Sequence, residues 1–292
     1  MRPRAFLDGP LRTFAEAALG ASIASAHDLS WPHGEARVVG LRTTGGRRAV
    51  LKAHRTAAKH RREVAAYGGW AAQLSPWVAP LLAVRDEAPA AILLGYVPGR
   101  PGLAEDDPAA EAVHREAGVW LARLHRTHAR DDDPLPLAEA YRRRSEAWIA
   151  RARDRVPAAT LRSVRSRWAP AFPALDGRPR VPCHRDMGPR NWLVADGRLR
   201  AVIDFEHARP DVAEVDFARL ATTVWPRWPE LRAAFLAGYD GADGPGDPDA
   251  PWVPGLLALE ALGTVVWAVE HGDAASERRG REALTRGLEG TL

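Results

Sequence analysis

Apolar positions in the first third of the chain occur in short runs and amphipathic stretches, a pattern typical of a sheet with helices packed on it. From about residue 100 onward they recur with helical spacing instead. The elements predicted before residue 94 are a helix at 11–19, strands around Val38 and Leu51, a helix through Glu63, and strands near Leu82 and Leu93. Later helices are predicted at 109–128, 135–153, 161–168, 228–239 and 252–271. The pattern predicts a mixed α/β lobe followed by a mostly helical lobe.

One stretch in the second half departs from the helical spacing. Two short apolar runs, 192–194 and 199–203, flank Asp196-Gly197. An Asp-Gly pair between apolar runs is a strong signal for a β-hairpin. Because a hairpin returns the chain to its starting point, Asn191 at its entrance and Asp204 at its exit are expected to lie side by side.

The residues around this hairpin are those of phosphoryl transfer. His184-x-Asp186-x-x-x-x-Asn191 precedes the hairpin and Asp204 follows it. This order of an acid, an amide and a second acid is that of kinases. We expect Asp186 to be the catalytic base, because the attacking hydroxyl is a poor nucleophile and needs an acceptor that aligns it. Asn191 and Asp204 offer the hard oxygen ligands that Mg²⁺ prefers, so they are the predicted metal ligands.

The alternative interpretation is that these are unrelated loop residues. The spacing from His184 to Asn191 can occur by chance when it stands alone. Its combination with the hairpin and with Ile-Asp-Phe-Glu at 203–206 favours a kinase site.

A kinase site also needs a cation on the phosphates, and Lys52 is the candidate. It lies in a strand-like apolar run at 48–53, and Lys59 is the only other lysine of the chain. A buried amine is costly unless it is paired. Glu63, near the start of the next helical segment, is the expected partner. The alternative is an ordinary strand-edge lysine whose amine stays in water.

The remaining nucleotide contacts are less specific. The chain has neither a GxGxxG nor a P-loop motif. In the candidate phosphate loop at 30–35, Gly34 would let the backbone approach phosphate oxygens. An apolar run at 90–97 is followed by a Pro-Gly turn, and Gly95, Tyr96 and Val97 are expected near the nucleobase. A core strand that simply ends there explains the same three residues.

Taken together, these residues make the chain resemble the aminoglycoside phosphotransferase and choline-kinase-like family, within the protein-kinase-like fold. The resemblance covers most of the chain, includes Leu-Gly-Tyr-Val-Pro-Gly at 94–99 and Leu-Ala-Arg-Leu-His at 121–125, and is strongest over 183–220. It implies an α+β, bilobal fold. Residues 1–97 would form a nucleotide-binding lobe with an antiparallel sheet and a helix. Residues 98–292 would form a mostly helical lobe with the catalytic loop and the acceptor-binding helices.

The resemblance also implies roles for individual residues. Asp186 would be the base, Asn191 and Asp204 would hold magnesium, and Lys52 would clamp the phosphates while paired with Glu63. Asp216, in Val-Asp-Phe-Ala at 215–218, is similar to the family acid that braces the catalytic loop.

Several positions depart from the family pattern. His184 is followed by arginine where many members have glycine, and Asp-Phe at 204–205 is followed by glutamate rather than glycine. The second departure favours a small-molecule kinase over a protein kinase. Gly188 stands where a protein kinase often carries a phosphate-contacting lysine, so Arg185 and Arg190 are candidates for that charge. His184 is expected to orient the loop by hydrogen bonding.

Composition argues against several other classes. The chain has 292 residues, of which 46% are hydrophobic and 27% charged, as is ordinary for a globular protein. No apolar run approaches the roughly 20 residues that span a membrane. Asp8 and Arg12 interrupt the N-terminal segment, so we expect no signal peptide and a cytoplasmic location. Cys183 is the only cysteine, which excludes an internal disulfide, and a buried thiol is favoured over a nucleophile.

The charge of the chain has two interpretations. Its basic character is compatible with nucleic-acid binding, but the arginines are spread along predicted helices with acids nearby, so no nucleic-acid partner is expected. Residues 240–277 contain eight acids and no lysine or arginine. In the resembled family the C-terminal helices line the acceptor pocket, where such acids would attract an amine-bearing substrate. A solvated acidic loop explains them equally well.

These features predict a Mg²⁺-dependent kinase that transfers the γ-phosphoryl group of ATP or GTP to a hydroxyl of a small molecule. The expected acceptors are antibiotics or related sugar-, nucleoside- or amine-containing natural products, in resistance or in biosynthesis. We expect a monomer or homodimer with no membrane partner. The alternatives are an atypical protein kinase and a non-catalytic nucleotide-binding pseudokinase. The joint presence of the predicted lysine, base and metal ligands argues against the pseudokinase.

Overall fold

The computed structural model describes residues 7, 9–31, 36–102, 104, 106–128 and 135–290. The chain divides into two compact units. Unit 1 comprises Met1–Gly102 and Arg190–Ala208, and unit 2 comprises Leu103–Pro189 and Arg209–Leu292. The single boundary predicted after residue 97 differs from this division, because the segment that contains the hairpin belongs with the N-terminal residues.

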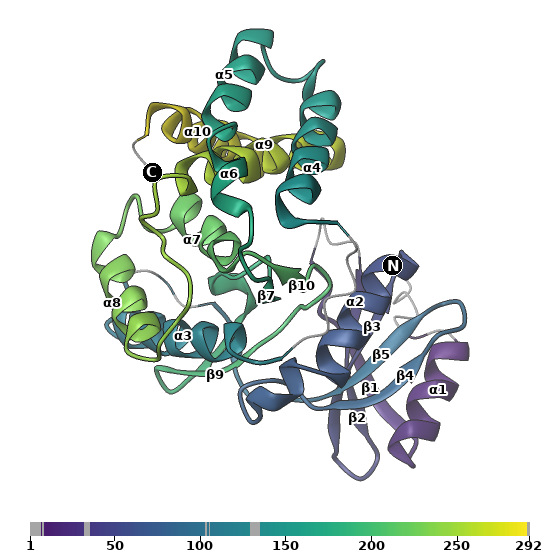
Figure 1. Cartoon of the computed structure of the whole chain (residues 1–292). Coiled ribbons are helices and arrows are strands. Elements are labelled where there is room, and N and C mark those ends of the chain that lie inside the picture. Colours follow the sequence, from purple (N-terminus) through teal and green to yellow (C-terminus); the bar gives the residue numbers. More distant parts are fainter. Residues whose placement is uncertain are drawn as a thin grey trace. The chain divides into compact units, whose positions relative to one another are not determined.

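Unit 1 is built on a five-stranded antiparallel sheet in the order β1-β2-β3-β5-β4 (Figure 1). Its strands are β1 (Ile23–Asp28), β2 (Ala36–Thr43), β3 (Arg48–His54), β4 (Leu81–Arg85) and β5 (Ala91–Gly95). Its helices are α1 (Gly9–Leu19), α2 (Ala57–Gly68) and the short η1 (Ala71–Leu74). The antiparallel sheet and the helix predicted for the first lobe are confirmed.

The alternation of side chains along β3 decides which of them face the core. Ala49, Leu51 and Ala53 belong to the cluster of buried residues that includes the apolar residues of α1. Successive side chains of a strand point to opposite faces, so Lys52 and His54 face away from that cluster. The alternation along β3 thereby places these two polar side chains on the same face of the sheet.

The predicted hairpin is formed by β8 (Trp192–Ala195) and β9 (Arg198–Val202), and β8 also pairs with β6 (Arg100–Pro101). A 3₁₀ turn, η2 (Pro189–Asn191), precedes it. Asp196 and Gly197 have positive φ values of 53° and 66°, as a two-residue turn that matches the twist of the strands requires. The N–H of Ile203 donates to the carbonyl of Asn191 at 2.9 Å. The entrance and the exit of the hairpin are therefore adjacent.

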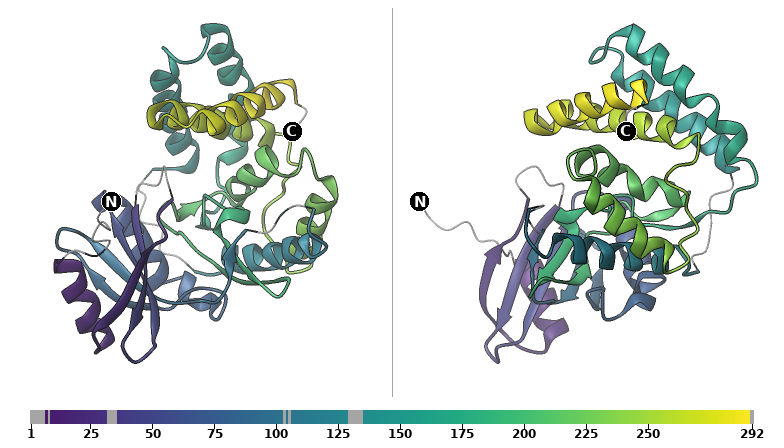
Figure 2. Two further views of the ribbon diagram at one scale, coloured as in Figure 1. Left: turned by 180° about the vertical axis from the view of Figure 1, so that it is seen from behind. Right: turned by 90° about the vertical axis from the view of Figure 1, so that its left-hand side faces the viewer.

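Unit 2 is mostly helical, with one two-stranded antiparallel sheet formed by β7 (Val181–Cys183) and β10 (Arg209–Asp211). Its helices are α3 (Ala110–His125), α4 (Leu137–Ala152), α5 (Ala158–Trp168), α6 (Ala171–Leu175), η3 (Ala213–Phe217), α7 (Ala218–Thr223), α8 (Pro229–Asp240), α9 (Val253–His271) and α10 (Ala274–Glu289). Figure 2 shows two further views of these elements. The sequence analysis missed the strands β1, β6, β7 and β10, the helices α6, α7 and α10, and the three short 3₁₀ helices.

Two features explain how the helices of unit 2 pack. A Cβ atom at Gly118 of α3 would lie 2.0 Å from the carbonyl oxygen of Phe235, and one at Gly238 of α8 would lie 2.0 Å from that of Arg115. The α3 and α8 backbones therefore approach so closely that only glycine fits at both positions. Helix α9 is long and apolar enough to cross a membrane, but most of it is buried, and it contributes to the core with α4, α5 and α10. It is a core helix of the unit.

Candidate active site

In unit 1, the amine of Lys52 contacts three carboxylates. Its Nζ lies 2.7 Å from Oε2 of Glu63, 2.6 Å from Oδ1 of Asp204 and 3.0 Å from Oε2 of Glu206. The Lys52 side chain is only 7% exposed. The predicted pair with Glu63 is therefore formed, and the alternative of an edge lysine with its amine in water is wrong.

Glu63 is held by further hydrogen bonds. Its Oε2 lies 2.6 Å from Nε2 of His54, and its Oε1 accepts the N–H of Phe205 at 3.2 Å. His54 in turn contacts His60, with 3.3 Å between the two Nδ1 atoms, and Nε2 of His60 lies 2.9 Å from Oδ1 of Asp86. A buried carboxylate with this many partners keeps one orientation, so Glu63 can hold the lysine amine in place.

The electrostatics of this cluster favour the charged forms of Lys52, Glu63 and Glu206. Burial by itself disfavours the charge of Lys52, but the carboxylates of Asp204, Glu63 and Glu206 outweigh it and raise the pKa of Lys52 well above its ordinary value. Burial likewise disfavours the charges of Glu63 and Glu206, but the neighbouring lysine amines lower the pKa of both glutamates. Opposite charges in a poorly solvated place keep one another ionised.

Sequence reasoning did not assign roles to Lys59 and Glu206. Nζ of Lys59 lies 2.7 Å from Oε1 of Glu206, whose other oxygen contacts Lys52. The two lysines of the chain therefore converge on one carboxylate. Their number was the available signal, because only two of the 41 lysine and arginine residues are lysines and they lie seven positions apart.

The hairpin brings the predicted metal ligands to its open end in unit 1. Asn191 is buried, and its backbone pairs with Ile203, the residue before Asp204. Asp204 has a φ of 71°, a value that is uncommon outside glycine and that persists only where the surroundings enforce it. Its side chain is 35% exposed. A carboxylate and an amide at one place are suitable donors for Mg²⁺, so these residues fit the metal.

The residues predicted near the nucleobase lie at the end of β5 and beyond it. The N–H of Gly95 donates to the carbonyl of Pro80 at 2.8 Å, and a Cβ atom at this position would lie 2.6 Å from Cγ of Pro80. The packing of Pro80 therefore explains the glycine. The Arg48 guanidinium lies 3.5 Å from the centre of the Tyr96 ring. Gly34, the predicted phosphate-loop residue, lies outside the described residues.

Val97 lines a groove of about 430 Å³ together with Pro76, Trp77, Pro98, Ala195, Asp196, Leu199 and Arg200. All of these residues belong to unit 1. The roles of Gly95, Tyr96 and Val97 at the nucleobase stay predictions.

In unit 2, the predicted catalytic loop follows β7 and is fixed by hydrogen bonds. The backbone N–H groups of His184 and Arg185 donate to the carboxylate of Asp216, the first at 2.8 Å. The N–H of Asp186 lies 3.3 Å from Nδ1 of His184. His184 and Asp216 thus contact the loop backbone, in the way that an orienting histidine and a bracing acid should.

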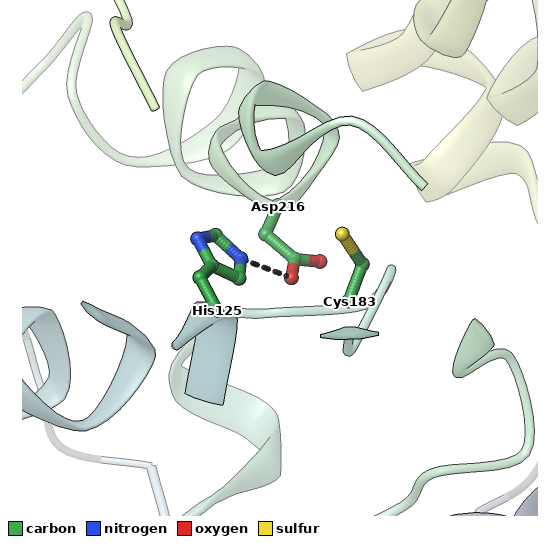
Figure 3. Close-up of side chains that lie close together, drawn as sticks. All are labelled: His125, Cys183 and Asp216. Atoms are coloured by element: carbon green, nitrogen blue, oxygen red, sulfur yellow. Dashed lines mark hydrogen bonds and ion pairs between the residues drawn. The ribbon is translucent and has the colours of Figure 1, made fainter. Parts of the chain in front are cut away.

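Asp216 also belongs to a buried group with His125 and Cys183 (Figure 3). Nε2 of His125 lies 3.1 Å from Oδ2 of Asp216, and the ring's Nδ1 lies 2.8 Å from the hydroxyl oxygen of Tyr239. The Cys183 thiol donates to two backbone carbonyls at 3.3 Å. Although these side chains are of metal-ligand type, their polar atoms already have protein partners. We interpret this group as structural, because it fixes the Asp216 carboxylate that accepts hydrogen bonds from the catalytic loop.

Asp186 has a contact that sequence reasoning missed. Nε and Nη2 of Arg219 lie 3.1 and 2.8 Å from Oδ1 of Asp186. Arg185, one candidate for a charge near Gly188, is buried and contacts Asp211 and Glu260 instead. Arg190, the other candidate, is exposed and belongs to unit 1. Arg219 therefore places a cation beside the predicted base within unit 2.

Most of the acids between 240 and 277 already have partners in unit 2. Asp243, Asp249, Glu260, Glu270 and Glu277 each form an ion pair with an arginine, and Asp273 caps α10. This pairing leaves little uncompensated negative charge on the described residues of the segment. It gives no support to the interpretation that these acids attract an amine-bearing acceptor.

The α+β fold described above is that of a kinase-like phosphotransferase. The profile of the phosphotransferase enzyme family matches residues 32–251. This is most of the chain, and the protein belongs to that family. The resemblance stated from the sequence, the α+β bilobal fold and the enzyme class, a phosphotransferase with a hydroxyl acceptor, are confirmed. No curated protein sequence matches the chain.

Solved structures of low sequence identity share the fold. A thermostable mutant of aminoglycoside phosphotransferase APH(4)-Ia, in ternary complex with AMP-PNP and hygromycin B, has a TM-score of 0.73 and 16% identity, with 97% of this chain and 98% of that chain covered. Macrolide 2'-phosphotransferase MphH from Brachybacterium faecium has a TM-score of 0.64 and 23% identity, with 94% and 96% covered. The gentamicin complex of APH(2")-IIa has a TM-score of 0.72 and 14% identity, with 98% and 99% covered.

Proposed function

We propose that this phosphotransferase moves the γ-phosphoryl group of ATP or GTP to a hydroxyl of a small natural product. The observation that carries the proposal is the buried amine of Lys52, which contacts Glu63 and also Asp204, a residue 152 positions away in the sequence. A nucleoside triphosphate needs a fixed cation on its phosphates and a carboxylate for its metal, and this cluster offers both. The relative that carries AMP-PNP and hygromycin B supports a nucleotide and a small-molecule acceptor.

Lys52 would bind phosphate oxygens while Glu63 and His54 hold its amine in position. The N–H of Phe205 also donates to Glu63, so the glutamate links the lysine strand to the residue after Asp204. Asp204 and Asn191 would hold Mg²⁺, whose charge neutralises the phosphates when it is bound. Catalysis by such a site depends on positioning and on charge neutralisation rather than on covalent chemistry.

Asp186 would accept the proton of the acceptor hydroxyl as that oxygen attacks phosphorus. A carboxylate suits this task because it aligns the hydroxyl without competing as a strong nucleophile. The hydrogen bonds from the loop backbone to Asp216 keep Asp186 at one position. This rigidity matters because misplacement by about 1 Å can cost roughly 100-fold in rate.

Antibiotics and related sugar-, nucleoside- or amine-containing natural products remain the proposed acceptors, in resistance or in biosynthesis. The cytoplasmic location and the monomeric or homodimeric state stay predictions. An atypical protein kinase and a non-catalytic nucleotide-binding protein are the alternatives that the same residues permit.

The test is phosphoryl transfer with Mg-ATP and with Mg-GTP against a panel of aminoglycosides, macrolides, peptide antibiotics, nucleoside antibiotics and amino alcohols, analysed by mass spectrometry. The control is Asp186→Ala. We expect one acceptor class to gain one phosphoryl group with the wild type and none with the variant. Nucleotide binding without any product would favour the non-catalytic alternative, and phosphate on an added protein would favour the protein kinase.

A further inference from the structure

Arg219 of α7 contacts two residues of the predicted catalytic loop. Its Nε and Nη2 lie 3.1 and 2.8 Å from a single oxygen of Asp186, Oδ1. Its stem lies over Gly188, where a Cβ atom would be 2.9 Å from Cγ of the arginine. The remaining nitrogen, Nη1, has no hydrogen-bond partner among the described residues. The side chain is 33% exposed, so the guanidinium can reach a further anion.

The glycine at 188 is explained by this arginine rather than by the backbone. Gly188 does not have a positive φ, so the conformation of the loop does not require glycine there. The residue is nevertheless buried, and its nearest obstacle is the stem of Arg219. A larger side chain at 188 would displace the arginine from Asp186. Gly188 and Arg219 are therefore spatially complementary.

The segment that carries Arg219 is tied to the loop at a second point. Asp216, three residues before the arginine, accepts hydrogen bonds from the backbone N–H groups of His184 and Arg185. Two independent contacts thus fix this segment against the loop. The guanidinium is held beside the base before any substrate binds, which is the preorganisation that electrostatic catalysis requires.

We propose that Arg219 is a catalytic residue that binds the oxygens of the transferred phosphoryl group. This inference rests on the proposed function. In the reaction a bond forms between the acceptor oxygen and phosphorus, and the bond from phosphorus to the bridging oxygen of the nucleotide breaks. The electron pair leaves with the nucleoside diphosphate, and the hydroxyl proton passes to Asp186.

The chemistry of that step brings the phosphoryl group to Arg219. A hydroxyl that is hydrogen-bonded to Asp186 must come within bonding distance of the phosphorus, so the phosphoryl oxygens pass within reach of the guanidinium on the same carboxylate. An arginine supplied in cis is known to stabilise the charge that develops on these oxygens. Its planar donors also match the geometry of a phosphoryl group.

The competing role for Arg219 is to orient Asp186 without touching the substrate. The first experiment compares Arg219→Ala and Arg219→Gln with the wild type, using ATP and the panel acceptor that gives product. We expect kcat to fall about 10²- to 10³-fold, with little change in either KM. Arg232→Ala is the matched control, since Arg232 is 36% exposed and also forms an ion pair, with Asp249 at 2.6 Å. Its kcat should equal that of the wild type.

The second experiment replaces ATP with ATPγS. Sulfur on the transferred group accepts hydrogen bonds poorly, so removal of a residue that binds this group should matter less for ATPγS than for ATP. We expect the loss in Arg219→Ala to be about tenfold smaller with ATPγS. An equal loss with both nucleotides would assign Arg219 to the orientation of Asp186 alone and would overturn the inference.

The third experiment tests the complementarity with Gly188. In the Arg219→Ala background, Gly188→Lys should regain about tenfold or more in kcat, because the space left by the arginine stem admits a lysine beside the base. Gly188→Lys alone should lower activity, since the arginine obstructs it. If the variant that combines Gly188→Lys with Arg219→Ala is no more active than Arg219→Ala, a cation beside Asp186 does not bind the phosphoryl group.

The outcomes separate the two proposals. A wild type without transfer to any panel member would remove the proposed function and this inference with it. An active wild type whose Arg219→Ala and Arg219→Gln variants keep full kcat would remove only this inference. Thermal melting of each variant shows whether it is folded, and Arg219→Gln decides the question if the alanine variant is unfolded.

Discussion

The two units each contain a buried group of residues that could hold a metal ion, and the two groups differ in what surrounds them. In unit 1 the group around Glu63 and Glu206 includes two lysines and Asp204, whose side chain is 35% exposed. In unit 2 the group of His125, Cys183 and Asp216 is fully buried and hydrogen-bonded within the protein. Side chains that are able to bind a metal therefore have different roles in the two units. Exposure and the number of existing partners decide whether a carboxylate is available to a ligand.

The largest expected effect comes from Asp204→Ala in unit 1. Loss of the carboxylate removes one of the two predicted metal ligands and the closest partner of Lys52, so transfer should fall by about 10³-fold or more. The melting temperature should stay close to that of the wild type, because the aspartate is partly exposed. Steady-state kinetics of phosphoryl transfer and thermal melting measure the two effects. An active Asp204→Ala variant would end the assignment of this group as the nucleotide site.

The next largest effect is expected in unit 2, where a substitution should lower stability. Asp216→Ala leaves the N–H groups of His184 and Arg185 and the ring of His125 without their acceptor. Unsatisfied buried donors cost about 1–3 kcal/mol each, so the free energy of unfolding should fall by about 3 kcal/mol or more. Urea denaturation measures this change. The control is Asp249→Ala, an exposed ion pair whose loss should cost less than about 1 kcal/mol.

Metal titration should separate the two groups directly. Mg²⁺ together with ATP should raise the melting temperature of the wild type, since a ligand that binds only the folded state stabilises it. The increase should be absent in Asp204→Ala and kept in Cys183→Ala. Zinc bound in proportion to protein in the wild type, and lost in Cys183→Ala, would show that the group in unit 2 is a metal site after all.

The contribution of each group to stability should also depend on pH, in the acid range for unit 1 and in the alkaline range for unit 2. In unit 1 the pKa of Glu206 is lowered in the folded state, so its stabilisation is present above the unfolded value and is lost as pH falls through the folded value. In unit 2 burial, reinforced by the charge of Asp216, raises the pKa of the Cys183 thiol well above its usual value. Stability that depends on the neutral thiol is present below the unfolded pKa and is lost as pH rises toward the folded pKa.

The measurement is urea denaturation across pH for the wild type, Glu206→Gln and Cys183→Ala. We expect the free energy of unfolding of the wild type and of Glu206→Gln to differ in its pH dependence only in the acid range. The wild type and Cys183→Ala should differ only in the alkaline range.

The smallest expected effect concerns the reactivity of the Cys183 thiol. Cys183 should not react with iodoacetamide at pH 8 until the protein unfolds. Rapid labelling of the native protein would contradict its buried, protonated state.

Local patterns predicted much of the fold because they report local physics. The Asp-Gly turn predicted the hairpin, since few residues other than these adopt the positive φ values that the turn needs. The apolar run around Leu51 predicted a strand, and alternation along it directs Lys52 away from the core of α1. By contrast, β1 has an irregular burial pattern and was missed. Its pairing partner in β2 decides its structure, not its own sequence.

The candidate site likewise has features that the sequence predicted and features that only the structure shows. The sequence alone determined the chemical types and their order: a lysine in a strand, a glutamate in the following helix, and Asp186, Asn191 and Asp204 around a hairpin. Only the tertiary structure decided that both lysines meet Glu206, that His54 holds Glu63, and that Arg219 covers Gly188 and contacts Asp186. These contacts join residues 9 to 154 positions apart. Their side-chain directions depend on how strands and helices pack, which no local pattern encodes.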